Sequence, residues 1–513
     1  MKSSFIVIVM GILFLAAYPT HATTFYVDAV RGNDSNSGTA PGHPWKTLAQ
    51  VNQHTFGPGD RILLKSGSVW NREQLRPKGS GSEKHPIIVD EYGGGNKPII
   101  RTEGHYVDAI RLENQSFWEI QNLEITNSDE VTSIKRGVYL LSNEYGDMRH
   151  IYIRHLYIHN VNGDDADKAN GGIIYESRGD TKPSRFVDLR IEYNTVCHVD
   201  RSGITGGSTN WDRRKWYPTL GLVIRHNIVD DTGGDGIVAV AASSPLVEYN
   251  VLSNADSRSR QANAGIWAWS TDNAIIQFNE VYLTHGNWDS MGFDSDWNSR
   301  GTIIQYNFSH DNNGGFVLVC DDGQQDGRGD IGNRGTIIRY NISQNDHLRV
   351  FNISGPITDT YIYNNTVYVR NGIPIDIVQY YNWHGLANGT YFFNNILDIQ
   401  SHGRIRLKTA AVSEPGYGDA KQQIFDNNLY FGADSDWPED RDAIRADPKF
   451  VNPAKAARYR DVVDYELLPG SAAIGSGKRI PHNGGRDILG HKVSECSGPS
   501  LGAVETSKCR PAQ

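Results

Sequence analysis

The chain has 513 residues and a nearly balanced charge, with 50 Lys and Arg against 59 Asp and Glu and a formal net charge of −9 at pH 7. Binding to a phosphate backbone needs a basic face, so this balance argues against a nucleic-acid partner. The chain has 4 cysteines, so disulfide bonds cannot be its main source of stability.

The first 22 residues have the pattern of a secretory signal peptide. Lys2 precedes an apolar run from Phe5 to Ala17, and small residues lead to Ala22, after which we expect cleavage. The apolar run is too short to cross a bilayer, so we predict no membrane span. The mature protein is therefore expected to be secreted or periplasmic.

A short phrase of apolar and polar residues recurs along the chain, for example "IEYNTV" at Ile191 and "IRHNIV" at Ile224. Nine copies carry Asn at the same place, and two earlier copies, at Ile120 and Ile153, carry Leu there. The nine residues are Asn194, Asn227, Asn250, Asn279, Asn307, Asn341, Asn365, Asn395 and Asn428. No long segment has apolar residues at helical spacing, so the repeat predicts strands.

Short strands with Gly-rich turns, repeated every 23 to 34 residues, are the pattern of a parallel β-solenoid. In that fold each coil lies about 4.8 Å from the next, and equivalent residues form columns along the axis. The Asn column is expected to be structural, because each side chain can hydrogen-bond to the next. The predicted fold class is all-β, a single parallel β-helix of about eleven coils.

A second phrase follows each Asn phrase after a turn, as in "DGIVAV" at Asp235, "AGIWAW" at Ala264 and "MGFDSD" at Met291. If the apolar residues after Gly and two places further on point inward, the residues between them face solvent. On three successive coils this outward column consists of Trp267 and Trp269, Asp294 and Asp296, and Val317 and Val319. Two Trp are therefore expected one coil away from two Asp on an exposed face.

These phrases, with the opening "TFYVDAVRGNDSNSGTAPGHPWKTLAQV", "GDRILLKSGSVW" and the closing "LPGSAAIGSG" and "LGAVE", resemble secreted right-handed parallel β-helix proteins of the pectate-lyase-like superfamily. The resemblance implies an N-terminal cap with the first coils over residues 23–110, a β-helix core over 111–450 and a C-terminal coil and tail over 451–513. It also implies a short helix near "KTLAQVNQH" that covers the first coil. The superfamily includes polysaccharide lyases, glycoside hydrolases, epimerases and phage tailspikes, so the reaction stays open.

The outward Trp and Asp residues predict a carbohydrate site. Indoles are costly to leave in water, and sugars offer apolar C–H faces that stack on Trp267 and Trp269. Glycosidic hydrolysis needs one protonated acid and one carboxylate, and Asp294 and Asp296 project the same way about 6.7 Å apart along the strand. The leading prediction is therefore a secreted glycoside hydrolase that degrades polysaccharides and requires no cofactor.

Two further acids are expected beside this pair. Asp235 begins the equivalent strand two coils earlier, and Asp322 of "CDDG" follows the strand one coil later. Both compete for catalytic roles as the third and fourth members of the cluster. Like charges this close raise the pKa of one carboxyl, which keeps that group protonated near neutral pH.

Two other functions remain open. Asp294, Asp296 and Asp321 also offer hard oxygen ligands for Ca²⁺, which would assist a lyase or epimerase that acts on uronates. A non-catalytic glycan-binding protein would use the Trp residues without turning over any polymer. In each case the partner is a polysaccharide or oligosaccharide, and we expect a monomer.

Other polar residues are candidates for substrate binding. Glu176 and Arg178 face outward on an earlier coil and offer an alternative centre for the active face. His285 and His310 lie in turns near the acidic cluster, where a structural role and a functional one are equally compatible with the sequence.

The 4 cysteines fall into two pairs. Cys496 and Cys509 flank a tail that contains Gly and Pro, and in an exported protein they are expected to close a small loop. Cys197 and Cys320 fall in different repeats and are expected to stay free. Two inserted loops are expected to wall the groove, namely Gly163–Gly172 and Thr209–Pro218.

Overall fold

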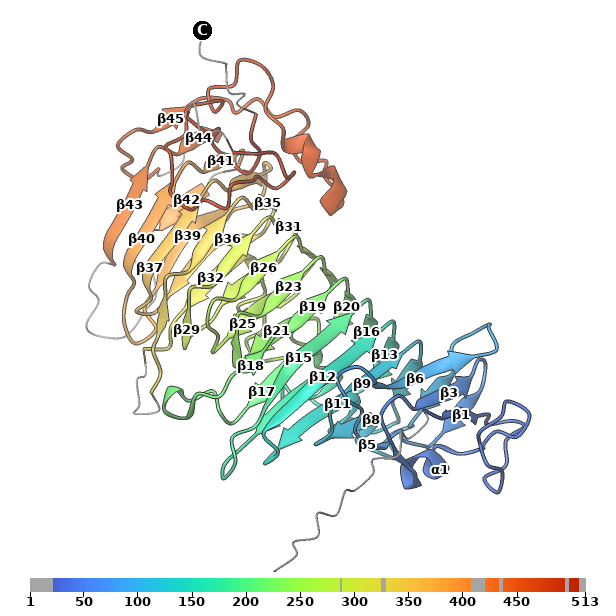
Figure 1. Cartoon of the computed structure of the whole chain (residues 1–513). Helices are drawn as coiled ribbons and strands as arrows, with labels where there is room; N and C mark the ends of the chain where they lie inside the picture. The colour runs from blue at the N-terminus through green and yellow to red at the C-terminus, as the bar shows by residue number, and fades with distance from the viewer. Residues whose placement is uncertain are drawn as a thin grey trace, which may run out of the picture.

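The computed structural model describes residues 22–286, 288–323, 329–401, 403–406, 420–432, 437–493 and 498–506. The coils form one elongated stack of parallel strands (Figure 1), which confirms the predicted all-β parallel β-helix. Within these residues no helix is long and apolar enough to cross a membrane. The predicted signal peptide, apart from Ala22, and the predicted bridge between Cys496 and Cys509 lie outside the described residues.

Three long sheets run along the stack, and the described strands of the first number 18. They are β1 (Thr24–Val27), β3 (Arg61–Lys65), β6 (Ile87–Tyr92), β9 (Trp118–Gln121), β12 (Asp147–Arg154), β15 (Arg185–Glu192), β18 (Thr219–Leu220), β19 (Val223–Arg225), β22 (Ala242–Ser243), β23 (Leu246–Glu248), β26 (Ile275–Gln277), β29 (Ser299–Arg300), β30 (Ile303–Gln305), β33 (Asn333–Arg334), β34 (Ile337–Arg339), β37 (Thr358–Tyr363), β40 (Asn388–Phe393) and β43 (Lys421–Asp426).

The second sheet comprises β4 (Val69–Asn71), β7 (Ile99–Arg101), β10 (Glu124–Asn127), β13 (Tyr157–Val161), β16 (Thr195–Val199), β20 (Ile228–Thr232), β24 (Val251–Ser253), β27 (Glu280–Tyr282), β31 (Phe308–His310), β35 (Ile342–Gln344), β38 (Thr366–Val369), β41 (Ile396–Ile399), β44 (Leu429–Gly432) and β45 (Ile444–Arg445). The third comprises β8 (Asp108–Glu113), β11 (Arg136–Asn143), β14 (Gly171–Arg178), β17 (Ser202–Ser208), β21 (Ile237–Val240), β25 (Ile266–Trp269), β28 (Met291–Ser295), β32 (Gly315–Cys320), β36 (Leu348–Ser354), β39 (Ile375–Tyr381) and β42 (Gly403–Arg406).

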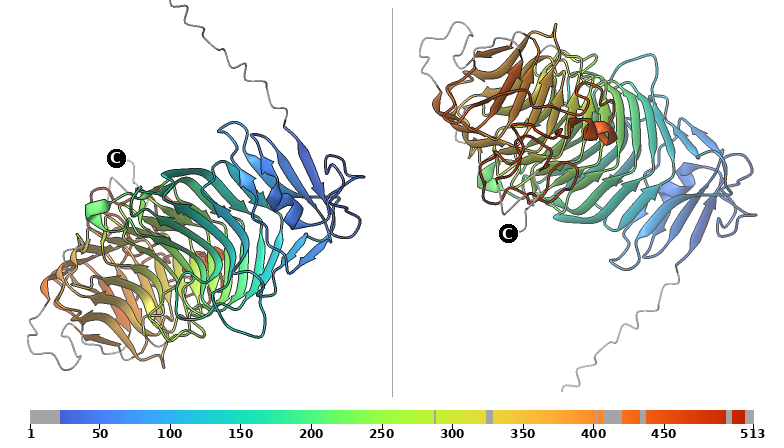
Figure 2. Two further views of the ribbon diagram at one scale, coloured as in Figure 1. Left: turned by 90° about the horizontal axis from the view of Figure 1, so that it is seen from below. Right: turned by 90° about the horizontal axis from the view of Figure 1, so that it is seen from above.

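A short helix, α1 (Leu48–Gln53), lies at the N-terminal end of the stack, within the stretch where the resemblance implied one (Figure 2). The Thr47 hydroxyl accepts a hydrogen bond from the backbone N–H of Gln50 at 3.1 Å and caps its first turn. Leu48 and Val51 are fully buried in the core of the molecule. Beside α1, β2 (Thr55–Phe56) and β5 (Lys78–Gly79) form a separate two-stranded sheet.

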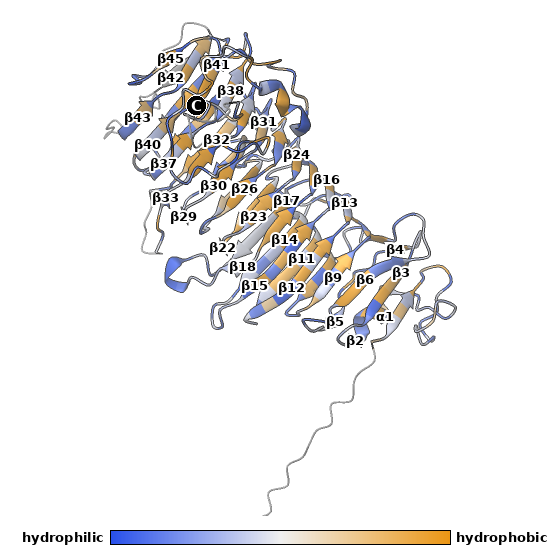
Figure 3. Ribbon diagram, turned by 45° about the horizontal axis from the view of Figure 1, so that its top comes forward, coloured by the Kyte–Doolittle hydropathy of each residue, from blue (hydrophilic) through white to orange (hydrophobic). Residues whose placement is uncertain are grey.

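Alternate residues of each strand point into the coil, so polar and apolar bands alternate along the strands (Figure 3). On the third sheet, Ile266 of β25, Phe293 of β28 and Val317 of β32 occupy paired inward positions and are fully buried in one continuous core. Trp267 and Leu318, which follow Ile266 and Val317 along their strands, belong to smaller hydrophobic clusters on the outer face of this sheet. These outer clusters position the candidate site.

The predicted Asn ladder is confirmed. Asn279 donates from its amide to Asn307 Oδ1 at 3.0 Å and to the carbonyl oxygen of Val247 at 3.0 Å. Asn250 donates to Asn279 Oδ1 in the same way at 3.0 Å. Equivalent bonds link all nine Asn residues from Asn194 to Asn428. Because each amide satisfies buried backbone groups as well as its neighbour, the ladder fixes the corner of every coil.

The residue before each ladder Asn adopts a left-handed conformation that non-Gly residues rarely take. Tyr193, His226, Tyr249 and Phe278 have φ values of 57°, 54°, 53° and 55°, a geometry that costs about 1–3 kcal/mol per residue. Their rings stack in a column with successive centroid separations of 4.7, 5.1 and 4.9 Å. Ring stacking and the ladder hydrogen bonds together offset the backbone cost.

We expect Asn279→Ala to destabilise the fold by about 2–4 kcal/mol, because it leaves buried donors and acceptors on both neighbouring coils unpaired. Urea unfolding followed by circular dichroism measures this change. Asn313→Ala is the matched control, because Asn313 is exposed and its loss is expected to cost less than about 0.5 kcal/mol. Equal stability of the two variants would contradict a structural role for the ladder.

The C-terminal segment covers part of the second sheet (Figure 1). Its helical turn η2 (Tyr459–Tyr465) packs there, and the Tyr459 hydroxyl donates to the carbonyl oxygen of Tyr306 at 2.7 Å. A second short turn, η1 (Arg213–Lys215), lies in the loop after β17, and Trp211 of this loop packs against Trp269 of β25. The loop that carries η1 therefore belongs to the third sheet's surroundings, where the candidate site is found.

Candidate active site

The outer face of the third sheet carries the predicted Trp and Asp residues. Trp267 of β25 pairs with Asp294 of β28, and Asp294 pairs with Leu318 of β32. Phe293, the neighbour of Asp294 on the strand, points into the core. The side chains of Trp267 and Asp294 therefore lie next to each other on the outer wall, which is the arrangement that the repeat register predicts.

The predicted outward column is wrong on β32. This strand pairs with β28 through Gly315 rather than Gly314, so its phrase starts one residue later than expected. Val317 and Val319 are consequently buried in the core, and Cys320 takes an outward position. Two consecutive Gly made the start of the phrase ambiguous in the sequence.

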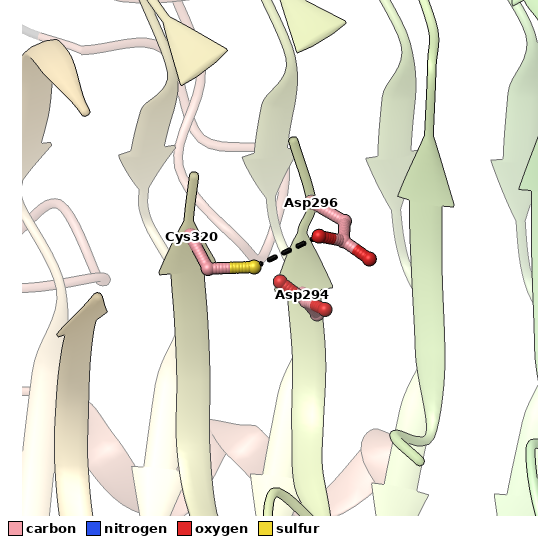
Figure 4. A group of neighbouring side chains, drawn as sticks. All are labelled: Asp294, Asp296 and Cys320. Carbon is pink, nitrogen blue, oxygen red and sulfur yellow. Dashed lines mark hydrogen bonds between the residues drawn. The ribbon is translucent and has the colours of Figure 1, made fainter. Parts of the chain in front are cut away.

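Asp294, Asp296 and Cys320 bring one oxygen or sulfur atom each to within 4.8 Å of one another (Figure 4). The Cys320 thiol donates to Asp296 Oδ1 at 2.9 Å, and the backbone N–H of Trp297 donates to the same oxygen at 2.7 Å. Asp294 is 4% exposed, and its buried Oδ1 has no hydrogen-bond partner. Leaving such an acceptor unpaired costs about 1–3 kcal/mol, which favours a protonated carboxyl or a bound ligand at this position.

The two carboxyl groups of this pair have raised pKa values. Burial raises the pKa of Asp294 well above its usual value, and repulsion from Asp296 and Asp289 raises it further. Burial also raises the pKa of Asp296, while hydrogen bonds from Cys320 and Trp297 oppose that rise. Two carboxylates this close do not both ionise readily. Since only Asp296 has donors for its anion, this geometry favours the proton on Asp294 and the charge on Asp296.

Asp235 lies in the same site and is fully buried. Its carboxylate accepts hydrogen bonds from the Trp267 indole N–H at 3.1 Å and from Lys168 Nζ at 2.9 Å. The Lys168 ammonium also lies 5.0 Å from the centre of the Trp267 ring and donates to the carbonyl oxygen of Ala262. Asp235 therefore orients Trp267, and Lys168 ties the Gly163–Gly172 loop across the site.

The sequence offered no strong signal for Lys168, because it is one charge among several in an inserted loop. Its part in the site follows only from the way the loop folds back over β21 and β25. Its charge also lowers the pKa of Asp294 and Asp296, although burial outweighs this effect. The loop thus contributes a cation beside the carboxylate pair.

An aromatic cluster forms one wall of the site. Trp269 packs against Trp211 and Trp297, with ring centroids 5.6 Å and 5.1 Å away. Trp211 comes from the Thr209–Pro218 loop, so this loop packs against Trp269. Trp267 is 8% exposed. The indoles of β25 are thus on the outer wall but largely covered by inserted loops.

The turn before β28 carries a fourth acid that the sequence interpretation missed. Asp289 is partly exposed, and burial raises its pKa while Arg349 opposes the rise. Arg349 donates to the carbonyl oxygens of Trp288 and Asp289, and Ser290 donates to the buried carboxylate of Asp256. The turn is therefore anchored from both sides, beside the carboxylate pair. The signal in the sequence was the position of Asp289, two residues before the strand phrase that starts at Met291.

Asp321 and Asp322 belong to a different group. With Asp330 they bring carboxylate oxygens to within 4.8 Å of one another, and burial raises the pKa of Asp321 and also that of Asp330, the latter to about 6. His384 Nδ1 lies 2.8 Å from the carbonyl oxygen of Asp322. The predicted Ca²⁺ grouping of Asp321 with the carboxylate pair is therefore not the one that the structure forms.

Glu176 and Arg178 lie on β14, four strands before β28 in the third sheet and roughly 19 Å from it by strand spacing. Glu176 accepts hydrogen bonds from Arg178 at 2.7 Å and from the Tyr139 hydroxyl. The two residues face outward, as the register predicts, but they form an ion pair that is separate from the carboxylate pair.

The two His residues lie along the second sheet. His310 of β31 is 5% exposed, and its ring stacks on Tyr282 at 4.7 Å and bonds to Asp311 at 3.0 Å. His285 follows β27 and bonds to Asn254 at 3.0 Å. These contacts favour structural roles for both, and the structure does not bring either into the Asp294, Asp296 and Cys320 group.

Comparison with known proteins agrees with the fold and finds a similar curated protein. A family model described as "Right handed beta helix region" matches residues 99–281. The chain is similar to a lacto-N-biosidase of Bifidobacterium longum subsp. longum, at 28% identity over an alignment that covers 96% of this chain and 37% of that protein. The chain thus spans about 37% of the length of this curated relative.

Among solved structures, a GH136 lacto-N-biosidase from Eubacterium ramulus matches with a TM-score of 0.63 and 28% identity, covering 72% of this chain and 67% of that chain. XylC in complex with xylose matches with a TM-score of 0.51 and 14% identity, covering 94% of this chain and 98% of that chain, which shows the fold alone. The protein is a right-handed parallel β-helix, as the sequence resemblance implied.

Proposed function

We propose that the protein is a secreted glycoside hydrolase that releases lacto-N-biose from oligosaccharides. The observation that carries the proposal is the coupled carboxylate pair beside Trp267, on a β-helix that is 28% identical to a solved lacto-N-biosidase. We favour an oligosaccharide over the polysaccharide of the leading sequence prediction, because both relatives are named for lacto-N-biose. Secretion rests on the signal-peptide pattern of residues 1–22.

Asp296 is the anionic carboxylate of the proposed reaction. It is partly exposed, so a bound sugar can reach it, and two donors stabilise its charge. In glycoside hydrolysis such a group either attacks the anomeric carbon or activates a water molecule. The Cys320 thiol and the backbone N–H of Trp297 hold the carboxylate in one orientation, which is the preorganisation that catalysis requires.

Two groups compete for the role of proton donor. The raised pKa favours Asp294, and exposure favours Asp289, because Asp294 is 4% exposed whereas Asp289 is partly exposed. A general acid must reach the leaving oxygen, so geometry takes precedence over pKa. We therefore assign proton donation to Asp289. Asp294, when protonated, is a neutral neighbour that lets Asp296 keep its charge.

The loops leave 8% of Trp267 exposed, and we propose that this exposed part contacts the sugar; its replacement tests this role. We expect Trp267→Ala to raise KM about two- to tenfold, because an aromatic contact is worth about 0.5–1.5 kcal/mol. Trp267→Phe is the matched variant, since it keeps a smaller aromatic ring and loses the hydrogen bond to Asp235. We expect a smaller KM change for Phe. Unchanged KM in both variants, measured with folded protein, would remove Trp267 from the binding site.

The function is tested with the purified full chain on p-nitrophenyl lacto-N-bioside, on an oligosaccharide that ends in lacto-N-biose, and on uronate polymers. Release of lacto-N-biose without any ultraviolet-absorbing unsaturated product is the expected result. We also propose that hydrolysis needs no metal, so a chelator should leave turnover unchanged. Unsaturated uronate products that disappear with chelator would instead identify a Ca²⁺-assisted lyase. Glycan binding without turnover of any substrate would identify a binding protein.

A further inference from the structure

We propose that Asp294, Asp296 and Cys320 form a binding site for a thiophilic divalent cation such as Zn²⁺ or Cd²⁺. The three side chains offer one soft sulfur and two carboxylate oxygens from the neighbouring strands β28 and β32 (Figure 4). Mixed thiolate and oxygen ligands suit Zn²⁺ and Cd²⁺ far better than Ca²⁺ or Mg²⁺, which take oxygen alone.

The geometry of the three donors is compatible with one cation. Their donor atoms lie within 4.8 Å of one another, and typical Zn–S and Zn–O bonds place tetrahedral ligands roughly 3.6 Å apart. Small rotations of the side chains therefore suffice to reach bonding distances. Asp294 and Cys320 are buried whereas Asp296 is partly exposed, so a water molecule can reach a bound cation from the side of Asp296.

The unpartnered oxygen of Asp294 is an independent sign that the group is built to hold something. Asp294 is 4% exposed and its Oδ1 has no hydrogen-bond partner, and one of its carboxylate oxygens lies within 4.8 Å of the donor atoms of Asp296 and Cys320. Buried acceptors in folded proteins are almost always satisfied. A cation between the three residues would satisfy this oxygen and cancel the repulsion within the carboxylate pair.

One other acidic group among the described residues offers only oxygen ligands, which makes it a comparison site for a cation that prefers sulfur. The group of Asp321, Asp322 and Asp330 holds carboxylates and no sulfur. A hard cation such as Ca²⁺ would choose that group over the one containing Cys320. Binding that depends on Cys320 is therefore diagnostic for the proposed site.

If the proposed function also holds, the cation is an inhibitor. It would occupy the carboxylate of Asp296 and the space where the sugar binds, so inhibition should be competitive with substrate. Binding converts the Cys320 thiol to a thiolate, and the released proton passes to the buffer. The loss of activity should then be proportional to the fraction of enzyme molecules that hold the cation.

Titration of the full chain with Cd²⁺ alone tests the site, because a cadmium–thiolate bond gives an ultraviolet charge-transfer band. We expect the band in the wild type and in Cys197→Ser, which replaces the other described free cysteine, on β16. We expect Cys320→Ser to lack the band and to bind Cd²⁺ at least about tenfold more weakly. Asp294→Asn keeps the thiol, and it should weaken binding without abolishing the band.

The outcomes separate the site from the function. A band of equal size in Cys320→Ser, or unchanged affinity in both Cys320→Ser and Asp294→Asn, would overturn the proposed site. Cd²⁺ binding that depends on Cys320 in a protein without hydrolase activity would support the site and count against the proposed function. For an active enzyme, competitive inhibition by Zn²⁺ that chelator reverses, and that weakens in Cys320→Ser, is the expected result.

Discussion

Asp296→Asn is expected to lower kcat/KM on lacto-N-biosides by at least about 1,000-fold, a loss of about 4 kcal/mol of transition-state stabilisation. The substitution keeps the shape of the side chain and removes the one carboxylate that has donors arranged around its charge. An amide neither attacks an anomeric carbon nor takes a proton from water. Steady-state rates on the p-nitrophenyl substrate measure the effect.

The control for this prediction is Asp188→Asn on β15 of the first sheet. Asp188 bonds to Tyr152 and Arg190 at the surface, so its replacement should leave kcat/KM unchanged. Circular dichroism spectra and thermal transitions show whether Asp296→Asn is folded. A folded Asp296→Asn enzyme with wild-type turnover would place the reaction elsewhere on the molecule.

The fold could be predicted from the sequence because its signal is repeated many times. Asn279 alone says little, but nine equivalent Asn at similar spacing predict coils, a column and a corner. In the structure each of these copies has a ladder hydrogen bond at its Asn and a left-handed residue before it. A wrong prediction for one copy leaves the predictions for the other copies unchanged. The example is β32, which pairs with β28 through Gly315 and not through Gly314.

The carboxylate pair could also be predicted, because a strand alternates its side chains regardless of tertiary detail. Asp294 on β28 and Asp296 directly after it had to leave the same face once Phe293 pointed inward. Prediction failed where the chain departs from the coil. Lys168 reaches the site from an inserted loop, and Asp289 reaches it from a turn held by Arg349. Neither contact follows from the spacing of the repeat.

Nearness in the sequence was also the reason that we expected His310 and Asp322 beside the carboxylate pair. His310 follows Asp294 closely, yet it belongs to the second sheet and stacks on Tyr282. Asp322 follows Cys320 by two residues, yet it groups with Asp321 and Asp330. In a solenoid, residues a few positions apart can face different sheets once the chain turns a corner, so nearness in sequence is a weak guide to a shared site.

The identity of the proton donor gives the second large effect. We expect Asp289→Asn to lower kcat/KM on a natural oligosaccharide at least about 100-fold. The loss should be much smaller on p-nitrophenyl lacto-N-bioside, because p-nitrophenolate leaves without protonation. Asp294→Asn mimics the protonated form of a buried acid, so its loss should be smaller than that of Asp289→Asn and should not depend on the leaving group.

The pH profile gives an independent measure of the same assignment. Burial raises the pKa of Asp289, so this carboxyl keeps its proton to higher pH than an ordinary Asp does. Since the donor must be protonated, kcat/KM on the oligosaccharide should fall as pH rises through that raised pKa. Asp289→Asn should lose this alkaline decline, whereas Asp294→Asn should keep it.

Thermal stability measures how strongly burial opposes the ionisation of Asp294. A carboxyl whose pKa is raised in the folded state destabilises the fold at pH values above its unfolded pKa, because burial opposes its ionisation. Asp294→Asn should therefore raise the melting temperature, and the gain should grow with pH up to the folded pKa. If Asp294→Asn instead shows the loss that depends on the leaving group and Asp289→Asn does not, the donor is Asp294, and burial has not kept it from the substrate.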